Sequence, residues 1–364
     1  MTTDTLTIEA EAKYRDAVSR ESVYIGDTKE SAAQAEQLCD IGIKHPLTFQ
    51  PERTTEQISS DVTFPCSENT EGFTLSQLCR DLIELTKPRI VVMILVTTLA
   101  TAFIGAGQPV HLIDLFLLLL GTGLVAASAG AANQIWERGI DGKMSRTAKR
   151  PISSGRLHWF HGSLYAGFLG ILGCGLILKE FGLAPAAVGA STWLLYVLFY
   201  TPMKTRTSWN TTLGAVAGAL PMLIGYTATG GQLTDLTGWL LFGILAAWQY
   251  PHFMAIAWMY REQYEQAGFK MSTTVDPSGR SAGIQSVVGS LILIACAVGL
   301  CWMRSNVMGA IFSTLLTLLF AWPMLNASIR FAGCPDDQIA RSLLRKSLLV
   351  LPLVLAVVTA TLLW

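Results

Sequence analysis

Residues 112–132 read LIDLFLLLLGTGLVAASAGAA, and residues 133–151, which follow directly, read NQIWERGIDGKMSRTAKRP. The first stretch is almost wholly apolar and, as a helix rising 1.5 Å per residue, is long enough to cross about 30 Å of hydrocarbon. The second stretch is polar and rich in Lys and Arg. Residues 112–151 therefore predict a membrane-spanning helix that is followed by a charged loop.

Eight further segments are apolar over a similar length. Hydrophobic residues make up 51% of the 364 residues and charged residues 14%, against about 25% charged residues in soluble domains. Membrane β-strands are excluded because the apolar runs show no alternation of apolar and polar residues. The sequence therefore predicts an all-α integral membrane protein with nine transmembrane helices. The predicted spans are 90–107, 112–132, 158–178, 183–200, 210–229, 236–256, 282–303, 307–329 and 343–363.

The loops between these spans alternate in charge. With the amino end in the cytoplasm, the inside loops and the start of the last span hold 15 Lys and Arg residues, and the outside loops hold 2. Because basic residues collect in cytoplasmic loops, this asymmetry favours a cytoplasmic amino terminus and a carboxyl terminus on the outside.

Residues 1–80 differ in composition from the membrane domain predicted at 81–364. They contain 7 Lys and Arg against 14 Asp and Glu, whereas the remainder contains 19 against 12. The acidic, aliphatic-poor part predicts a mostly disordered cytoplasmic extension, followed by an amphipathic lead-in at 73–84. The basic residues of the membrane domain lie in short loops, which argues against a nucleic-acid partner. The seven cysteines lack paired spacing, which argues against a disulfide framework or a zinc site.

The loop at 133–151 has a spacing typical of a metal site. Asn133, Glu137 and Asp141 recur every four residues, so on a continuing helix they project from one face. Three oxygen ligands on one face suit Mg²⁺, which usually shares its coordination with substrate phosphates. Cations suited to bind those phosphates follow in the same loop. They are Arg138, Arg146 and Arg150. The alternative is that these bases only orient the loop and the acids only pair with them.

Two further loops on the predicted cytoplasmic side carry charged candidates. Lys204 and Arg206 follow the fourth span. On their own they are weak candidates, and they become binding candidates only if they form a further wall of an anion site. Arg261 and Glu262 follow the sixth span. One diphosphate cannot touch all of these cations, so the first loop is expected to supply most of the contacts.

The combined motifs resemble the UbiA-type intramembrane prenyltransferases over about residues 80–364. Asn133, Glu137 and Asp141, followed by Arg-Thr at 146–147 and Arg-Pro at 150–151, are similar to the first aspartate-rich motif of that family. Glu137 stands where Asp is common. Pro-His-Phe at 251–253 and Tyr-Arg-Glu at 260–262 resemble the branch of the family that farnesylates protohaem.

The sequence also departs from the family at Gln263, where many members carry Asp. Glu262 is then the predicted carboxylate of the second cluster, with Asp276 in reserve. No second Asp-x-x-x-Asp motif follows.

The resemblance implies nine helices around a central cavity and Mg²⁺ as the cofactor. It implies farnesyl transfer from farnesyl diphosphate to the 2-vinyl group of protohaem IX (haem B), which gives haem O for haem–copper oxidases. Haem is then a substrate rather than a cofactor. The expected setting is the bacterial plasma (inner) membrane, with a haem A synthase or an oxidase assembly protein as a partner.

The resemblance also implies roles for single residues. Catalytic roles fall on Asp141, Glu137, Glu262 and His252, and metal binding falls on Asn133, Glu137 and Asp141. Diphosphate binding falls on Arg138, Arg146, Arg150, Lys204, Arg206 and Arg261. Of these cations, Arg146, Arg150 and Lys204 are the strongest candidates.

The haem candidates are His252, Tyr250 and Trp258, which together with Trp248 and Phe253 suggest a flat apolar wall. An imidazole there is able to bind haem iron, to hydrogen-bond a propionate or to activate water, and packing beside a proline is the remaining interpretation.

Two other functions stay open at this point. One is a prenyltransferase of the same type that acts on a quinone-precursor aromatic or a chlorin. The other is a polytopic transporter, which predicts inverted repeats and acids within the spans. The acids here lie at the cytoplasmic ends of spans and the sequence shows no internal repeat, which favours the enzyme.

Overall fold

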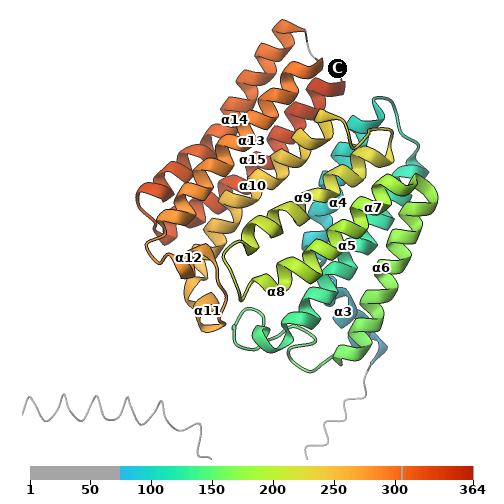
Figure 1. The fold of residues 1–364 in the computed structure, drawn as a ribbon, viewed down its shortest axis with the longest axis vertical. Helices are drawn as coiled ribbons and strands as arrows, with labels where there is room; N and C mark the ends of the chain where they lie inside the picture. Colours follow the sequence, from blue (N-terminus) through green and yellow to red (C-terminus); the bar gives the residue numbers. More distant parts are fainter. Residues whose placement is uncertain (1–73, 305, 364) are drawn as a thin grey trace, which may run out of the picture. The chain divides into compact units, whose positions relative to one another are not determined.

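The computed structural model of the protein describes residues 74–304 and 306–363. Most of the acidic extension predicted at 1–80 therefore lies outside the described residues. Within the described ranges the fold is all-α, as predicted (Figure 1).

Nine helices in these ranges are long and apolar enough to cross a membrane, which confirms the predicted number. One of them is a composite of three segments, α7 (Leu183–Leu194), η1 (Leu195–Tyr200) and α8 (Thr201–Met203). The other eight are α4 (Pro88–Ala106), α5 (Leu112–Asp141), α6 (Trp159–Phe181), α9 (Asn210–Ala228), α10 (Leu236–Met259), α13 (Arg280–Arg304), α14 (Val307–Gly333) and α15 (Asp337–Leu363).

Several spans extend beyond their predicted bounds, and α5 and α15 extend the furthest. α5 continues beyond residue 132 to Asp141, because the polar side chains of its last two turns are buried against other helices rather than exposed in a loop. α15 begins at Asp337 rather than at residue 343. The side chain of Asp336 accepts hydrogen bonds from the backbone N–H of Gln338 at 2.7 Å and of Ile339 at 3.3 Å, which satisfies the first turn of that helix.

One end of the bundle carries most of the short helices and long connections (Figure 1). It includes α3 (Leu75–Leu85), the connection 142–158, α8, α11 (Arg261–Gln266) and α12 (Ser272–Val275). We call it the polar end. α5, α10 and α14 finish there, so side chains from the last turns of α5 and α10 reach the same level of the bundle.

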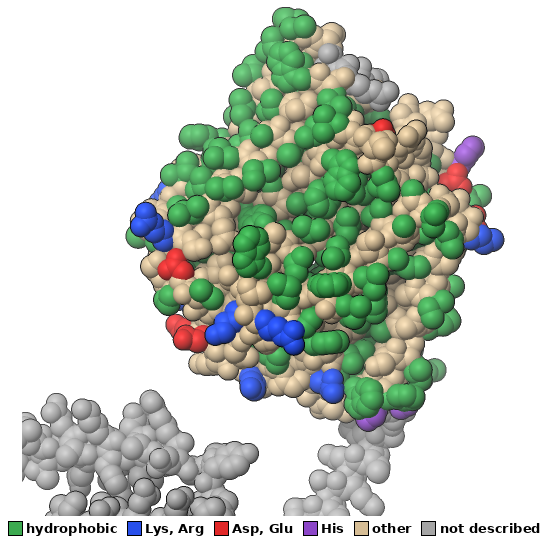
Figure 2. All heavy atoms as spheres, viewed as in Figure 1, with side chains coloured by type: hydrophobic (Ala, Val, Ile, Leu, Met, Phe, Trp, Pro, Cys, Tyr) green, Lys and Arg blue, Asp and Glu red, His purple; other side chains and the backbone are tan. Residues whose placement is uncertain are grey.

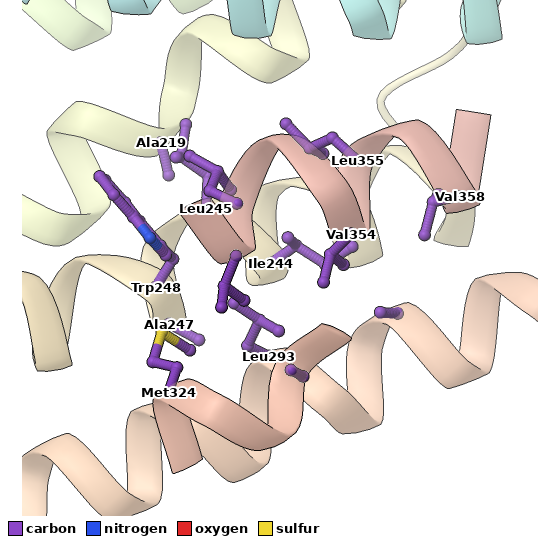
Figure 3. Packing of buried hydrophobic residues seen from close by; sticks show 14 of the residues in the cluster. Ala219, Ile244, Leu245, Ala247, Trp248, Leu293, Met324, Val354, Leu355 and Val358 are labelled. Atoms are coloured by element: carbon purple, nitrogen blue, oxygen red, sulfur yellow. The ribbon is translucent and has the colours of Figure 1, made fainter. Parts of the chain in front are cut away.

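The interior contains one packed group made by α10, α13, α14 and α15 and a second group that includes α4 and α7. The two groups meet at α9. α9 packs against α4, α7 and α10, and it is the most deeply buried of the spans. α10, α13, α14 and α15 pack on one another through a cluster that includes Trp248, Leu293, Met324 and Val354 (Figure 3). Burial of these apolar side chains between helices fixes the ends of α10 and α15 relative to each other.

α4 and α9 cross at close range. A side chain at Gly225 would overlap the carbonyl oxygen of Thr98, and one at Gly105 would overlap the carbonyl oxygen of Tyr226. Small residues of this kind let the backbones of two membrane helices approach. The crossing holds α4 in place, and the residue that precedes α4, Lys87, lies at the polar end.

The outer surface is divided between apolar and charged parts. Figure 2 shows hydrophobic side chains over the middle of the visible face and Lys and Arg side chains mainly along its lower edge. Large apolar residues such as Ile171 and Leu319 are 79% and 64% exposed. Such a surface is stable against lipid and not against water, so the protein is a multi-pass membrane protein.

The predicted lead-in at 73–84 is a helix in the structure. α3 begins after Thr74, whose hydroxyl accepts from the backbone N–H of Gln77 at 3.4 Å. Arg156 of the 142–158 connection anchors the helix, because its guanidinium binds Asp81 at 2.9 Å and Glu84 at 2.8 Å. α3 is therefore tied to the polar end.

Candidate active site

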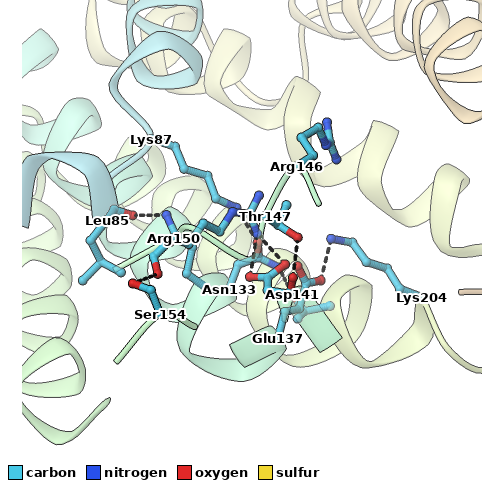
Figure 4. Close-up of polar contacts among 12 residues, drawn as sticks. Leu85, Lys87, Asn133, Glu137, Asp141, Arg146, Thr147, Arg150, Ser154 and Lys204 are labelled. Carbon is cyan, nitrogen blue, oxygen red and sulfur yellow. Dashed lines mark hydrogen bonds and ion pairs between the residues drawn. The ribbon is translucent and has the colours of Figure 1, made fainter. Parts of the chain in front are cut away.

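Three polar side chains form a buried stack on the last turns of α5. Asn133, Glu137 and Asp141 are 0%, 3% and 1% exposed. Their spacing of four residues places them on one helical face, and Figure 4 shows them directed toward the same group of cations. Because a buried carboxylate is costly without a partner, each member of this stack requires a compensating group.

A different cation meets each member of the stack (Figure 4). Lys204 donates from Nζ to Glu137 Oε1 at 2.6 Å, and Arg150 donates from Nη1 to both carboxylate oxygens of Asp141 at 2.7 Å. Lys87 donates to the side-chain oxygen of Asn133. Three cations therefore surround two carboxylates, which leaves the cluster with an excess of positive charge.

Lys87 is the functional candidate that the sequence analysis did not identify. It precedes Pro88 at the start of α4, with φ 56°, and within 74–304 and 306–363 no other non-glycine residue has a positive φ. A residue held in this region is strained and is often functional. The signal in the sequence is a Lys directly before the Pro that opens the first span, a position that lies outside the loops between spans.

The charge states of the two lysines differ. Burial, and then the nearby guanidinium of Arg150, lowers the pKa of Lys87 from 10.5 to about 7. Burial alone would lower the pKa of Lys204 as well, but the Glu137 carboxylate raises it above its usual range. Lys204 is therefore a permanent cation of the site, whereas Lys87 gains most from an added anion.

A π-helical segment positions the far side of the stack. In η1 the backbone widens, and the hydroxyl of Thr201 donates to the carbonyl oxygen of Tyr196 at 2.8 Å. The same hydroxyl accepts from Asn133 Nδ2 at 3.0 Å. Single-turn π segments often occur at functional sites. Here η1 fixes the amide of Asn133, and hence the direction of its oxygen.

Arg146 lies at the border between the cluster and solvent. It is exposed, donates to the hydroxyl of Tyr264 at 3.3 Å and stacks over the ring of Tyr260 at 4.8 Å from its centroid. Arg146 thus joins the connection after α5 to the segment after α10.

The structure places four predicted site residues outside the cluster. Arg138 is exposed and donates to the carbonyl oxygen of Ile135, because it lies about 100° around α5 from Glu137. Arg261 pairs with Asp337 at 2.8 Å, and the side chain of Glu262 is 81% exposed. Arg206 is also exposed.

Asp276, the alternative carboxylate of the second cluster, caps the amino-terminal end of α13. Its oxygens accept from the backbone N–H of Ser278 at 3.1 Å and of Ser281 at 2.8 Å. A hydrogen bond from the hydroxyl of Ser278 is the main reason that the pKa of Asp276 is lowered, and the hydrogen bond from the backbone N–H of Ser281 lowers it further. This carboxylate is therefore occupied as a helix cap.

The haem candidates of α10 do not share a face. The hydroxyl of Tyr250 donates to Thr212 of α9 at 3.0 Å, and Trp258 is buried against Phe331 of α14. His252 instead faces α15, where its Nδ1 lies 3.0 Å from the hydroxyl of Ser347. Neighbours in sequence point in different directions on a helix, because successive residues turn by about 100°. A flat wall made of all three is not formed.

The donor set of the α5 stack fits a hard divalent cation. No group of three His, Cys, Asp or Glu side chains in the described ranges comes together as a metal site. At the stack, two carboxylates, those of Glu137 and Asp141, are joined by the amide oxygen of Asn133. Such oxygen sets, completed by water and phosphate, suit Mg²⁺.

Comparison with known proteins gives the family. The pattern of the UbiA prenyltransferase family matches residues 94–351. A relative from Rhodopirellula baltica named protoheme IX farnesyltransferase is 56% identical, over 76% of this chain and 98% of that relative. A relative of the same name from Solibacter usitatus is 41% identical, over 76% of this chain and 96% of that relative.

The fold is also similar to solved structures. A UbiA homolog from Archaeoglobus fulgidus bound to GPP and Mg²⁺ superimposes with a TM-score of 0.57 and 15% identity, over 76% of this chain and 99% of that chain. At that identity the likeness concerns the fold alone. The family pattern over residues 94–351 and the two relatives show that the chain belongs to the UbiA prenyltransferase family, among its protoheme IX farnesyltransferases.

Proposed function

We propose that the protein transfers the farnesyl group of farnesyl diphosphate to the 2-vinyl group of protohaem IX and so makes haem O. The observation that carries the proposal is the buried α5 stack with its three cations, which provides both metal ligands and anion contacts. The names of the relatives support the same substrates, since the chain spans 98% and 96% of the two relatives compared.

The diphosphate would bind where the cations converge. Lys87, Arg150 and Lys204 each hold a stack oxygen now, and the same donors are able to turn to phosphate oxygens when a divalent cation takes the carboxylates. Adding a divalent cation together with an ionised prenyl diphosphate brings the formal charge of this cluster close to zero. Arg146 would close the site from the solvent side.

The chemistry follows from this charge distribution. As the bond between C1 of the farnesyl group and the diphosphate oxygen breaks, Lys204 and Arg150 stabilise the negative charge that collects on the leaving group. A bound Mg²⁺ would add Lewis-acid stabilisation of the same oxygens. Because the stack is almost fully buried, a diphosphate bound there would be largely shielded from bulk water.

The second half of the reaction takes place on the porphyrin. The terminal vinyl carbon supplies the electron pair for the new bond to C1, which leaves a cation on the adjacent carbon. Water then adds to that cation and loses a proton, giving a hydroxyethylfarnesyl side chain. Diphosphate is the other product. The helices supply the apolar surroundings that both intermediates need.

His252 is the side chain that we propose to contact the haem. Of the three roles that its residue type allows, ligation of the iron fits best, since neutral His is a frequent haem ligand. Trp248 stacks on its ring at 4.6 Å between centroids and would extend the apolar contact.

The proposed setting is the bacterial inner membrane with the polar end toward the cytoplasm. The 15-to-2 distribution of Lys and Arg supports an amino terminus inside and a carboxyl terminus outside. Transfer of the product to a haem A synthase or an oxidase assembly protein belongs to the same proposal.

The test is a mass measurement on haem. The purified protein is incubated with protohaem, farnesyl diphosphate and Mg²⁺, and the haem is weighed by mass spectrometry. The expected product is heavier by one farnesyl group and one hydroxyl group, because the water that adds to the vinyl-derived cation loses a proton. Recovery of unmodified haem, with farnesyl transfer to a quinone-precursor aromatic instead, would contradict the proposal.

A further inference from the structure

Two contacts hold His252, one to Ser347 of α15 and one to Trp248, which itself binds Ser347. Its Nδ1 lies 3.0 Å from Ser347 Oγ, and its ring stacks on Trp248 at an interplanar angle of 23°. The indole N–H of Trp248 in turn donates to the backbone carbonyl oxygen of Ser347 at 2.7 Å. Ser347 itself is fully buried. One residue therefore fixes both the imidazole and the ring on which it stacks.

The bonding of Ser347 also determines the tautomer of His252. The hydroxyl of Ser347 lies 2.7 Å from the carbonyl oxygen of Leu344, which is able only to accept. A serine hydroxyl has one hydrogen, so when it donates to Leu344 it must accept from Nδ1. Both contacts are hydrogen bonds only if Nδ1 carries the proton. Nε2 is then the unprotonated nitrogen with a free lone pair.

Nε2 is not used by the protein itself. Four buried side-chain N or O atoms in the described ranges lack a hydrogen-bond partner, and Nε2 of His252 is not one of them. The only hydrogen bond of the imidazole within these ranges is that of Nδ1. Within these ranges the protein therefore leaves the lone pair of Nε2 without a hydrogen-bond partner, so it is available to an added ligand.

His252 and the α5 stack lie at similar distances from the polar end of the bundle. His252 and Asn133 each lie roughly two helical turns, about 11 Å, before the ends of α10 and α5, and both helices finish at the polar end. A large planar substrate ligated at His252 would thus lie at the level of the α5 stack.

We propose that Ser347 is a positioning residue, which presents Nε2 of neutral His252 to the metal of the porphyrin substrate. The inference rests on the proposed function and adds to it the residue that sets the tautomer and the ring plane. Groups that bind the second nitrogen of a ligating His orient the ring and strengthen the ligand, and their loss costs about 10–100-fold in metal affinity.

The experiment compares variants by titration with ferrous and ferric haem in detergent, without farnesyl diphosphate. Ser347→Ala is expected to weaken haem binding about 10-fold or more and to lower the frequency of the iron–histidine stretch in resonance Raman spectra of the ferrous complex. Ser347→Thr keeps the hydroxyl and should restore both values. Ser290→Ala is the matched control, since Ser290 is a buried serine that bonds to Ser328 on α14.

The outcomes separate the two proposals. An iron–histidine band in the wild type that is lost in His252→Ala but unchanged in Ser347→Ala would overturn the role of Ser347 alone. A wild type that prenylates haem but shows no such band would overturn ligation by His252. Failure to prenylate haem at all would overturn the proposed function. If Ser347→Ala does not assemble, Ser347→Cys keeps the volume with a weaker bond and is expected to fall between alanine and wild type.

Discussion

The last turns of α5 and of α10 both descend to the polar end, but they place their polar side chains in opposite ways. On α5, Asn133, Glu137 and Asp141 share one buried face and meet three cations. On α10, Tyr250 and His252 point to α9 and α15. α5 thus presents a charged cluster, whereas α10 presents a single imidazole among residues that hold helices together.

The difference shows how each region can act. A diphosphate needs several charges at one point, and a spacing of four residues on a helix provides them. In the proposed function a porphyrin would use one oriented ligand and apolar surroundings, so the other side chains of α10 would only have to keep the helix in place. The predictions below test this division by changing matched residues in each region.

The largest effect is expected at Asp141. Asp141→Ala removes a proposed metal ligand and leaves Arg150 without its partner, so turnover should fall about 10²-fold or more, as for loss of a transition-state contact. The control is Glu262→Ala, whose side chain is 81% exposed and should be replaceable with little effect. Steady-state rates with farnesyl diphosphate and protohaem measure both. Equal losses in the two variants would show that the α5 stack has no special role.

The next effect concerns Lys87. Lys87→Met should weaken binding of farnesyl diphosphate about 10-fold or more, since a hydrogen bond to a charged group contributes about 1.5–3 kcal/mol. Arg89→Met, two residues along α4 and exposed, is the control and should bind normally. Calorimetric titration of each variant gives the affinities. Normal affinity in Lys87→Met would place the diphosphate away from the start of α4.

A smaller difference is expected between two arginines at the polar end. Arg146→Ala should raise the KM for farnesyl diphosphate by a few-fold with kcat retained, because Arg146 adjoins the cluster. Arg206→Ala should leave KM unchanged, because Arg206 is exposed and outside the cluster. If both substitutions raise KM equally, the bases act through their overall charge and not through contact.

The smallest effect is expected for Tyr250→Phe. The substitution removes one hydrogen bond to Thr212 and should cost about 1 kcal/mol of stability, with haem affinity and turnover preserved. Thermal unfolding and haem titration measure the two quantities. A loss of haem affinity as large as that of His252→Ala would show that α10 does provide an extended haem wall.

The sequence was sufficient for those features that depend on local periodicity. Hydropathy predicted the nine spans, and the spacing of Asn133, Glu137 and Asp141 predicted one shared face. Both follow from helix geometry alone. Lys204 and Arg150 were also among the predicted cations, and the structure brings them to that face.

The remainder depends on contacts between distant segments, which local patterns do not encode. Lys87 reaches Asn133 because α4 packs beside α5, and Thr201 meets the same residue through the wide turn of η1. The direction of His252 is set by Ser347, which is far from it in sequence. Arg138 lies on α5 between stack residues and Glu262 lies on α11 close to Tyr264, yet both side chains are exposed, so proximity in sequence was a poor guide.

A structure with Mn²⁺ and an unreactive thio analogue of farnesyl diphosphate tests the central claim most directly. The anomalous signal of the metal is expected beside Asn133, Glu137 and Asp141, with the analogue's phosphates bound by Lys87, Arg150 and Lys204 and the present Lys204–Glu137 ion pair opened. A metal bound at Glu262 or Asp276, or phosphates held by Arg138 and Arg206, would contradict the account.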